Sequence, residues 1–451
     1  MQNKKRVITY GTFDMFHIGH LNLLKRAKEL GDYLVVGVTS ESYDRSRGKL
    51  NVSQDLQTRM QVIQDLPFVD EVIVETHKGQ KEKDIQNYQI DLFVIGDDWL
   101  TKFDYLNQWC NVIYLPRTKG VSSTLLRENI ETIRLGVIGT GRIAQRFIKE
   151  ALCVNKIEIL SVLSKEICRA EVFIKQNDIL YGFDHLEDFL DSGIDAVYIA
   201  SINEYHYEHC KAALLHNKHV LCEKPVVLDQ TQLIELTQLA QKKQLVFMEG
   251  IKTAYAPCFI KLLEELQGGI IGEIKEVRST FSKLILDKTA REWSHPLGGA
   301  TNELASYTQL ICTKVLGVSN KINFYTSISH HVDSSNIIIS EYDNDKIAIS
   351  TVAIGRKSDG SAIISGTQGY IFVPAPWWLT KEFFVKFEDP NKELTYHYEF
   401  EGDGLRYEIS EFISCINRKQ YESKLLTHAE MLEINKTLSL FNQKRDNGFK
   451  S

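Results

Sequence analysis

The sequence has no C-x-x-C cysteine pair, no apolar run long enough to cross a membrane and no excess of positive charge. Its eight cysteines are scattered, which indicates reduced thiols and neither a disulfide framework nor a structural zinc site. A bilayer-spanning helix needs about 20 apolar residues. The net charge of −6 gives no basic footprint for nucleic acid. The polar first residues lead directly into an apolar strand, so no signal peptide is expected. We therefore expect a cytoplasmic protein with neither a membrane span nor a nucleic-acid partner.

A chain of 451 residues is too long for one ordinary domain. Its apolar content of 43% and charged content of 25% are typical of globular proteins. No cluster of Pro, Gly or Ser separates residues 124 and 134, so the parts on either side are expected to be coupled closely. We expect three domains, at residues 1–131, 132–251 and 252–451.

The first polar motif is the stretch from Tyr10 to His20, which joins a predicted strand at 7–10 to a helical pattern that begins at Leu21. Such a strand-to-helix turn offers free backbone N–H groups and the positive end of the helix dipole, which suit a phosphate. His17 and His20 are three residues apart, so both can face one phosphate from one side of the helix.

Strand and helix patterns alternate through the rest of the first 115 residues, which predicts a doubly wound parallel sheet. The further predicted strands are 34–38, 71–74, 91–96 and 112–115. Polar groups follow the last two: Asp97 after the first of these, and the run 117–124 after the second. Ligands bind at the carboxyl ends of such strands, so these groups are candidates for a triphosphate site.

The H-x-G-H motif behind a Gly-Thr-Phe-Asp turn resembles the nucleotidylyltransferase superfamily, and residues 6 to about 130 resemble the glycerol-3-phosphate cytidylyltransferases nearly end to end. The resemblance implies that His17 and His20 stabilise the transferred phosphate and that Arg47 and Lys81 bind an alditol phosphate. The residues that it implies for CTP binding are Thr12, Phe13, Asp14, Lys49, Arg59, Asp97, Arg117, Thr118, Ser122, Ser123 and Thr124. Pro67 stands where the family has an arginine, which removes one cation near the nucleotide.

The chemistry that this resemblance implies is an in-line attack of a phosphomonoester oxygen on the α-phosphorus of CTP, with pyrophosphate leaving. Positioning and charge stabilisation dominate such a reaction. Mg²⁺ is expected on the triphosphate, although no carboxylate cluster marks a protein metal site. The expected acceptor is glycerol 3-phosphate, with ribitol 5-phosphate and glycerol 2-phosphate as alternatives.

A second strand–turn–helix pattern carries the dinucleotide fingerprint G-x-G-x-x-A at Gly139, Gly141 and Ala144, followed by a predicted strand at 157–163. Ser164 and Lys165 stand at the end of that strand, where NAD-preferring sites usually carry an acid. A hydroxyl and a cation suit the 2′-phosphate of NADP. Glu166 beside them leaves NAD open.

Two later motifs resemble the glucose–fructose oxidoreductase/inositol dehydrogenase family. They are Ser201–His206, with Ile202 in place of the usual proline, and Glu223-Lys224-Pro225. The resemblance implies that Lys224, whose bond to Pro225 could be cis, lies between nicotinamide and substrate, where a lysine can donate a proton to a carbonyl oxygen. The implied dinucleotide-binding residues are Gly139, Gly141, Arg142, Ile143, Ala144, Ser164, Lys165, Asn203, His206, Glu223 and Lys224.

The segment Gly298–Tyr307 matches a third motif of that family and lies in a predicted helix at 301–315. Glu303 replaces the usual Asp and Ala305 the usual Gly, whereas Tyr307 matches a position that often serves as an acid. Glu303 and Tyr307 are four residues apart, so both can face the cleft. The further strands predicted at 321–328, 336–341, 346–354 and 382–388 indicate a mainly antiparallel sheet.

The predicted fold class is therefore α/β: a Rossmann-like nucleotidylyltransferase domain, an NAD(P)-binding Rossmann domain, and an α+β domain with a mainly antiparallel sheet. We expect a bifunctional enzyme, a homodimer, that transfers CMP from CTP to an alditol phosphate and interconverts a small keto compound and a polyol with NADP or NAD. The second activity would supply the alditol, and the products would feed a teichoic-acid-like or capsular polymer. The alternative is a non-catalytic, regulatory nicotinamide-binding module.

Overall fold

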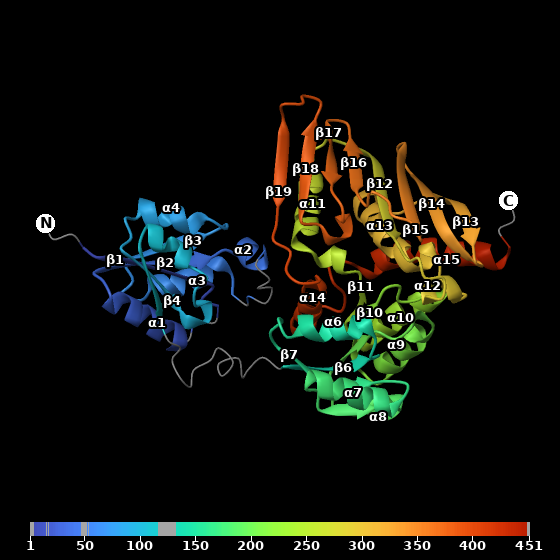
Figure 1. The fold of residues 1–451 in the computed structure, drawn as a ribbon, viewed down its shortest axis with the longest axis horizontal. Coiled ribbons are helices and arrows are strands. Elements are labelled where there is room, and N and C mark those ends of the chain that lie inside the picture. The colour runs from blue at the N-terminus through green and yellow to red at the C-terminus, as the bar shows by residue number, and fades with distance from the viewer. Residues whose placement is uncertain are drawn as a thin grey trace. The chain divides into compact units, whose positions relative to one another are not determined.

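The computed structural model describes residues 4–14, 16, 18–46, 52, 54–115 and 132–448. The chain divides into two compact units, residues 1–131 and 132–451 (Figure 1). Within the described ranges, no helix combines the length and the apolar character that crossing a membrane requires.

The first unit contains a five-stranded parallel sheet in the order β3-β2-β1-β4-β5. This confirms the predicted doubly wound pattern. Its strands are β1 (Arg6–Gly11), β2 (Tyr33–Thr39), β3 (Glu71–Glu75), β4 (Leu92–Gly96) and β5 (Asn111–Leu115). Its α-helices are α1 (Ile18–Glu29), α2 (Glu41–Ser46), α3 (Leu56–Gln64) and α4 (Gln80–Asn87), and two short 3₁₀ helices are η1 (Asp97–Trp99) and η2 (Asp104–Gln108).

Helices cover both faces of this sheet. Successive strand residues point to opposite faces, so each strand contributes side chains to the packing on both sides. Val7 of β1 packs on one face with Leu24 of α1 and Ile63 of α3. Its neighbour Ile8 packs on the other face with Ile85 of α4. Figure 1 shows α1 and α4 on opposite sides of the sheet. The near-continuous apolar strands follow from this double burial.

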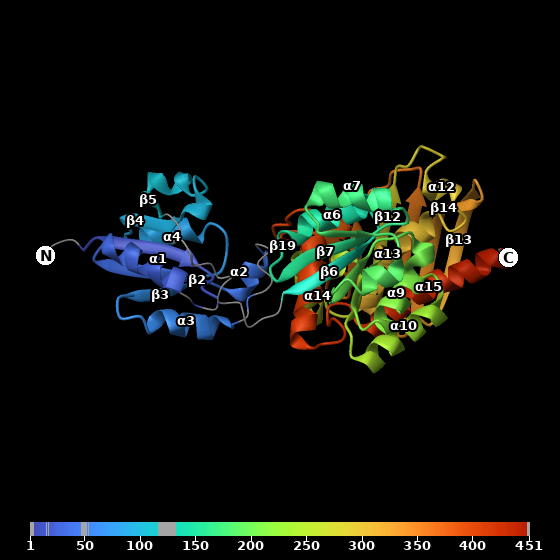
Figure 2. The ribbon, with the colours of Figure 1, turned by 90° about the horizontal axis from the view of Figure 1, so that it is seen from below.

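The second unit begins with a six-stranded parallel sheet in the order β11-β10-β9-β6-β7-β8. Its strands are β6 (Ile133–Ile138), β7 (Ile157–Leu163), β8 (Tyr181–Phe183), β9 (Ala196–Ile199), β10 (His219–Glu223) and β11 (Phe247–Gly250). Its helices are α6 (Arg142–Ala151), α7 (Ile167–Asn177), α8 (Leu186–Leu190), η3 (Asn203–Tyr205), α9 (His206–Leu215) and α10 (Gln230–Lys243). Figure 2 shows α6 and α7 on one side of β6 and β7, and α9 and α10 on the other.

An eight-stranded sheet in the order β13-β14-β15-β12-β16-β17-β18-β19 follows. Its strands are β12 (Ile274–Lys283), β13 (Lys321–Ser329), β14 (Val332–Tyr342), β15 (Lys346–Ile354), β16 (Ala362–Gly366), β17 (Gly369–Val373), β18 (Glu382–Phe387) and β19 (Glu393–His397). Its helices are η4 (Lys252–Tyr255), α11 (Pro257–Gln267), α12 (Arg291–Ser294), α13 (Ala300–Leu316), η5 (Trp377–Leu379), α14 (Leu405–Arg418) and α15 (His428–Asp446).

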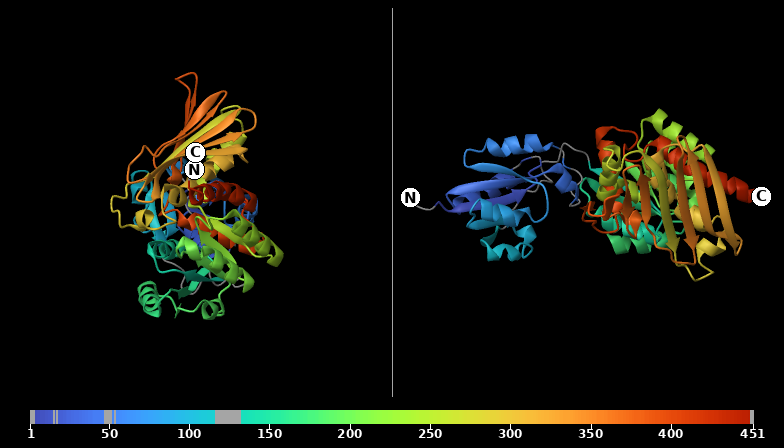
Figure 3. Two further views of the ribbon diagram at one scale, coloured as in Figure 1. Left: turned by 90° about the vertical axis from the view of Figure 1, so that its right-hand side faces the viewer. Right: turned by 90° about the horizontal axis from the view of Figure 1, so that it is seen from above.

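This sheet is mainly antiparallel, as predicted, with one parallel pair, β12 and β15. The parallel pair arises because α13 crosses the sheet between β12 and β13, and two antiparallel turns then return β15 alongside β12. Helix α13 packs against the sheet through Leu304 and Ala305, and α15 through Leu438. The side of the sheet away from these helices faces the viewer in the right-hand panel of Figure 3.

The C-terminal part returns to the dinucleotide half through α14. Arg406 at its start pairs with the buried Glu150 of α6, Nη2 to Oε1, at 3.0 Å. Asp403, just before α14, accepts a hydrogen bond from Arg146 Nε at 2.6 Å and, through its carbonyl, one from Lys252 Nζ at 2.7 Å. These charge-assisted contacts tie the two halves of the second unit together.

Glu249 at the end of β11 is buried, and burial raises its pKa to about 7. Because the ordinary value is 4.5, the folded state holds the proton more tightly than the unfolded chain, so stability is lost as the pH rises from 4.5 through 7. The difference corresponds to about 3 kcal/mol at pH 8.5. We therefore expect Glu249→Gln, compared with wild type, to gain thermal stability on going from pH 5 to pH 8.5.

Thermal unfolding of both proteins at the two pH values measures this difference, and Glu171→Gln, at an exposed position on α7, is the control. Carboxyl groups that do not interact with Glu249 titrate equally in wild type and variant, so they cancel in the comparison; Glu223 is the neighbour whose charge acts on Glu249. Parallel melting curves for wild type and Glu249→Gln across the pH range would contradict the expectation.

Candidate functional site

The turn after β1 is fixed by close packing of an aromatic ring. Phe13 is buried and has a positive φ of 51°. Its ring lies so close to Gly11 that a Cβ at residue 11 would be 2.9 Å from it, which explains why this position lacks a side chain. The same ring makes an edge contact with His20 in the first turn of α1, at 5.4 Å between centroids. His20 is thereby held beside the turn, and its role at a phosphate stays a prediction.

Arg59 of α3 holds the turn after β1 in place through hydrogen bonds to backbone carbonyl groups. Its Nη1 donates to the carbonyl oxygens of Thr12 and Thr39, each at 2.8 Å, and its Nε donates to Gln54 O at 3.0 Å. The Thr12 hydroxyl donates to Asp44 Oδ1 at 2.8 Å. Arg59 is fully buried, so the role that the structure shows for it is positioning of the loops. Its direct contact with CTP stays a prediction.

Three other predicted residues of this site lie in the segments that follow strands β1, β3 and β4. Asp14 accepts a hydrogen bond from the backbone N–H of Gln54 at 2.9 Å, and Asp97 opens the exposed turn η1 directly after β4. Lys81 at the start of α4 is buried, forms an ion pair with Glu75 at the end of β3, and has its Nζ 4.5 Å from the centre of the Tyr10 ring. These positions agree with ligand binding at the carboxyl edge of the sheet.

The other predicted residues of the first site lie outside the described residues. They are His17, Arg47, Lys49, Arg117, Thr118, Ser122, Ser123 and Thr124.

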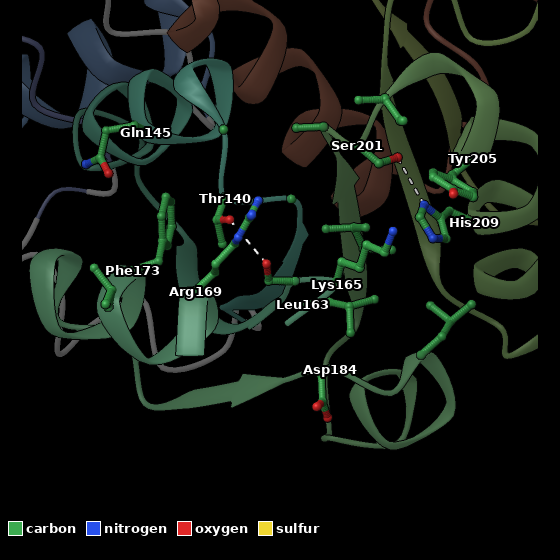
Figure 4. Close-up of a pocket in the computed structure, with 18 of the residues that line it drawn as sticks. Thr140, Gln145, Leu163, Lys165, Arg169, Phe173, Asp184, Ser201, Tyr205 and His209 are labelled. Atoms are coloured by element: carbon green, nitrogen blue, oxygen red, sulfur yellow. Dashed lines mark hydrogen bonds between the residues drawn. The ribbon is translucent and has the colours of Figure 1, made fainter. Parts of the chain in front are cut away.

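The dinucleotide turn after β6 is built for close approach. Gly139 has a φ of +110°, and a Cβ there would be 2.6 Å from the carbonyl oxygen of Ala200. A cavity of about 940 Å³ opens at this turn, and Gly139, Gly141, Ser164 and Lys165 line it, as predicted (Figure 4). The hydroxyl oxygens of Thr140 and Ser164, which both line this cavity, are 3.3 Å apart. Of the other predicted residues near the turn, Arg142 and Ile143 are the first residues of α6, and Ala144 in the same helix is buried.

Several residues of this cavity were missed from the sequence. Arg169 lies one turn after Lys165, and Figure 4 shows its guanidinium extending into the cavity beside Thr140. Lys165 lies just before α7 and Arg169 lies in its first turn. His209, whose Nδ1 is 3.0 Å from the Ser201 hydroxyl, also lines the cavity. Its position depends on the fold of α9, which no local motif reveals.

Lys224 follows β10 and contacts the half of the unit that contains the eight-stranded sheet. Its Nζ donates to the carbonyl oxygen of Glu303 on α13 at 3.0 Å and lies 5.9 Å from the centre of the Tyr307 ring. The Lys224–Pro225 peptide bond is cis. The structure therefore brings Lys224, Glu303 and Tyr307 together. Burial, together with the charges of Glu223 and Glu408, raises the pKa of Tyr307, so its hydroxyl keeps its proton.

Two buried carboxyl groups lie behind this lysine. Tyr198 donates to Glu223 Oε1 at 2.6 Å, and burial raises the pKa of Glu223. Glu408 of α14 is fully buried, and neither of its carboxyl oxygens has a hydrogen-bond partner among the described residues. Burial and the charge of Glu223 raise the pKa of Glu408. Sequence motifs gave no hint of Glu408, which comes from a helix about 180 residues farther along the chain.

His206 contacts two backbone carbonyl groups. It is buried, and its ring nitrogens lie 2.9 Å from Pro225 O and 3.0 Å from Ser201 O. Burial lowers its pKa. With both nitrogens against backbone carbonyls, the imidazole positions the loops after β9 and β10, and its direct contact with a dinucleotide stays a prediction. Asn203 is partly exposed at the start of η3.

Arg291 of α12 was also missed. Its Nη1 donates to Glu303 Oε1 at 3.0 Å, so Glu303 contacts Lys224 through its carbonyl and Arg291 through its carboxylate. The Nε and Nη2 atoms of Arg291 are buried and have no hydrogen-bond partner in the described part of the chain.

Comparison with known proteins finds relatives of each of the two units. Residues 8–129 match the model of the cytidylyltransferase-like family, and residues 133–251 that of the oxidoreductase family with an NAD-binding Rossmann fold. Over 129 residues, the chain is 47% identical to glycerol-3-phosphate cytidylyltransferase of Bacillus spizizenii, covering 29% of this chain and 99% of that protein. Over 309 residues it is 24% identical to trans-1,2-dihydrobenzene-1,2-diol dehydrogenase of Danio rerio, covering 66% of this chain and 92% of that protein.

Solved structures support the fold of the second unit. The 3-ketoreductase KijD10 of Actinomadura kijaniata, in complex with NADP and TDP-benzene, superposes with a TM-score of 0.61 at 20% identity, covering 68% of this chain and 96% of that chain. An oxidoreductase from Agrobacterium radiobacter, in complex with NAD⁺, L-tartaric acid and magnesium, gives a TM-score of 0.61 at 16% identity, covering 70% and 97%.

The chain therefore belongs to the cytidylyltransferase-like family through its first unit, and residues 133–251 of its second unit match the oxidoreductase family with an NAD-binding Rossmann fold.

Proposed function

We propose that the first unit transfers CMP from CTP to an alditol phosphate, with glycerol 3-phosphate as the first candidate. The turn that holds His20 against Phe13 is the observation that carries this proposal, and the identity along nearly the whole length of glycerol-3-phosphate cytidylyltransferase supports it. Ribitol 5-phosphate and glycerol 2-phosphate are the alternative acceptors, because family and fold do not fix a substrate.

In this reaction, an oxygen of the acceptor phosphate attacks the α-phosphorus of CTP, and pyrophosphate leaves on the opposite side. His20 is placed to stabilise charge on the transferred phosphate, with His17 as its proposed partner. Arg59 and Asp44 keep the Thr12 turn in one conformation, which limits the cost of ordering the site. Mg²⁺ would bind the triphosphate itself, since no three metal-ligating side chains converge within the described residues.

We propose that the second unit interconverts a ketone and an alcohol. NADP or NAD supplies hydride transfer when bound. Lys224 is placed to donate a hydrogen bond and a proton to the carbonyl oxygen, with the protonated Tyr307 as a second donor. The cavity at Gly139 fits a dinucleotide, because its Cβ-free turn allows the close approach that a pyrophosphate requires.

We propose further that the two activities form a sequence, in which reduction of a keto precursor supplies the alditol that receives CMP. The presence of both enzymes in one chain supports this order. A product of this kind is an activated building block for teichoic-acid-like or capsular polymers.

We propose a homodimer that uses the uncovered face of the eight-stranded sheet. Tyr325, Ile337 and Tyr370 are 61%, 40% and 39% exposed, and they alternate along their strands with residues that face the core. Exposed apolar side chains that share one sheet face are typical of association surfaces.

Two variants should separate the activities. We expect His20→Ala to lower CTP-dependent pyrophosphate release by roughly 100-fold or more, since loss of one preorganised donor costs about 2.7–4 kcal/mol. Its NADPH binding should be unchanged. Lys224→Ala should abolish ketone reduction and leave pyrophosphate release from a supplied alditol phosphate intact. Pyrophosphate and NADPH assays on the full chain measure both.

The control is His77→Ala, an exposed histidine of the first unit. Near-normal transfer by His20→Ala would contradict the first assignment. If no keto compound is reduced and no alditol is oxidised by wild type, the non-catalytic binding module replaces the second.

We predict a preference for NADP(H) over NAD(H), because Lys165 and Arg169 both line the adenosine end of the cavity. A charge-assisted hydrogen bond contributes about 1.5–3 kcal/mol, so Lys165→Asp or Arg169→Ala should weaken NADPH binding by roughly tenfold or more. NADH binding should change little in Arg169→Ala, and Lys165→Asp should reverse the preference. Fluorescence titrations with both cofactors measure this, with the exposed Lys175→Ala on the same helix as control. Equal affinity of wild type for both cofactors would remove the argument.

A further inference from the structure

We propose that the oxidoreductase site accepts a phosphorylated ketone and that Arg291 and Lys283, which no motif or family match assigns, bind its phosphate group. This inference rests on the proposed ketone reduction and names its substrate class.

The first observation is the incomplete pairing of the Arg291 guanidinium. One of its nitrogens donates to Glu303, and the other two are buried without a partner within the described residues. Two buried guanidinium N–H groups without acceptors are costly, because the hydration that they lose is not replaced. The charge of Arg291 also lowers the pKa of His206, which contacts Pro225 O, so the guanidinium lies near the Lys224–Pro225 segment. Two adjacent guanidinium N–H groups match two oxygens of a phosphate.

The second observation is a further cation at the end of β12. Lys283 is the last residue of β12, pairs with Ile354 of β15 and is partly buried. Burial together with the charge of Lys224 lowers its pKa to about 8. The charged groups that act on it are the cations Lys224 and Arg142 and the carboxylates Glu303 and Glu292. Glu303 is already shared with Arg291.

Glu303 therefore contacts Lys224 through its carbonyl and Arg291 through its carboxylate, and Lys283 is close enough for its charge to interact with Lys224 and Glu303. A dianionic phosphate there would supply the missing acceptors and reduce the repulsion between the lysines. The turn proposed to bind the phosphates of a dinucleotide is at Gly139, and none of Lys224, Lys283 and Arg291 is among the residues that line the cavity there.

The reaction balances with the ligands already proposed. The carbonyl carbon gains hydride from the reduced nicotinamide, the C=O π electrons move to oxygen, and that oxygen takes one proton from Lys224 or Tyr307. The products are an alditol phosphate and the oxidised dinucleotide, with the phosphate ester unchanged. Such a product is the class of acceptor that the first unit is proposed to use.

The experiment uses the full chain and compares dihydroxyacetone phosphate with dihydroxyacetone, and ribulose 5-phosphate with ribulose, at fixed NADPH. For wild type, we expect kcat/KM to be at least roughly 100-fold higher for the phosphorylated member of one pair. Arg291→Gln and Lys283→Gln should each raise the KM for that ketone phosphate by at least roughly tenfold, since each removes a charge-assisted contact. Arg278→Gln, an exposed arginine on the same strand as Lys283, is the matched control.

A binding measurement separates this inference from the proposed reduction. Glycerol 3-phosphate and ribitol 5-phosphate should change the fluorescence of NADPH bound to wild type, whereas glycerol and ribitol should not, and Arg291→Gln and Lys283→Gln should each weaken the effect. If the effect is present but no ketone is reduced, the phosphate site stands and the reductase function fails. Three results would overturn the inference. They are equal use of phosphorylated and free ketones, a fluorescence response to the unphosphorylated anion glycerate that equals the response to glycerol 3-phosphate, or undiminished binding of the alditol phosphates by both variants.

Discussion

The hydrogen bond from Lys224 Nζ to the carbonyl oxygen of Glu303 joins the two halves of the second unit at the point where its chemistry is proposed. Lys224 lies at the carboxyl end of a parallel strand, and Glu303 lies in the first turn of a helix that crosses the other sheet. The contact holds Lys224 beside the Tyr307 ring, whose centre is 5.9 Å from Lys224 Nζ. The pairs of Arg406 with Glu150 and of Arg146 with Asp403 hold the same two halves from the α14 side.

The interior of this unit holds charge that is only partly matched. Glu223 and Glu408 share a buried region in which both pKa values are raised, whereas Lys283 is held among other cations with a lowered pKa. Burying such groups costs stability unless they are paired. Their concentration around Lys224 is typical of active sites, where burial and neighbouring charges adjust proton affinity. The first unit follows another plan, in which the buried Arg59 satisfies backbone carbonyls and so fixes the shape of the nucleotide turn.

Local patterns in the sequence predicted most of the fold. The strand at 157–163 has the predicted bounds, and α13 extends the predicted helix by one residue at each end, because apolar runs and helical periodicity are properties of neighbouring residues. The glycine turn at Gly139 was predictable because one residue type tolerates that backbone. Arg291, Lys283 and Glu408 were not, since each becomes part of the site only when distant segments pack together. The parallel pairing of β12 with β15 has the same origin, because it follows from the path of α13 across the sheet.

The central claim is that one chain makes an alditol phosphate and activates it. The most direct measurement supplies the full-length enzyme with CTP, Mg²⁺, a keto phosphate and NADPH carrying deuterium at the transferable position, and follows the nucleotide products by mass spectrometry. The account predicts a CDP-alditol that carries one deuterium, formed with one NADPH consumed and one pyrophosphate released. Formation of a CDP-alditol only from added alditol phosphate, without deuterium and without NADPH consumption, would contradict it.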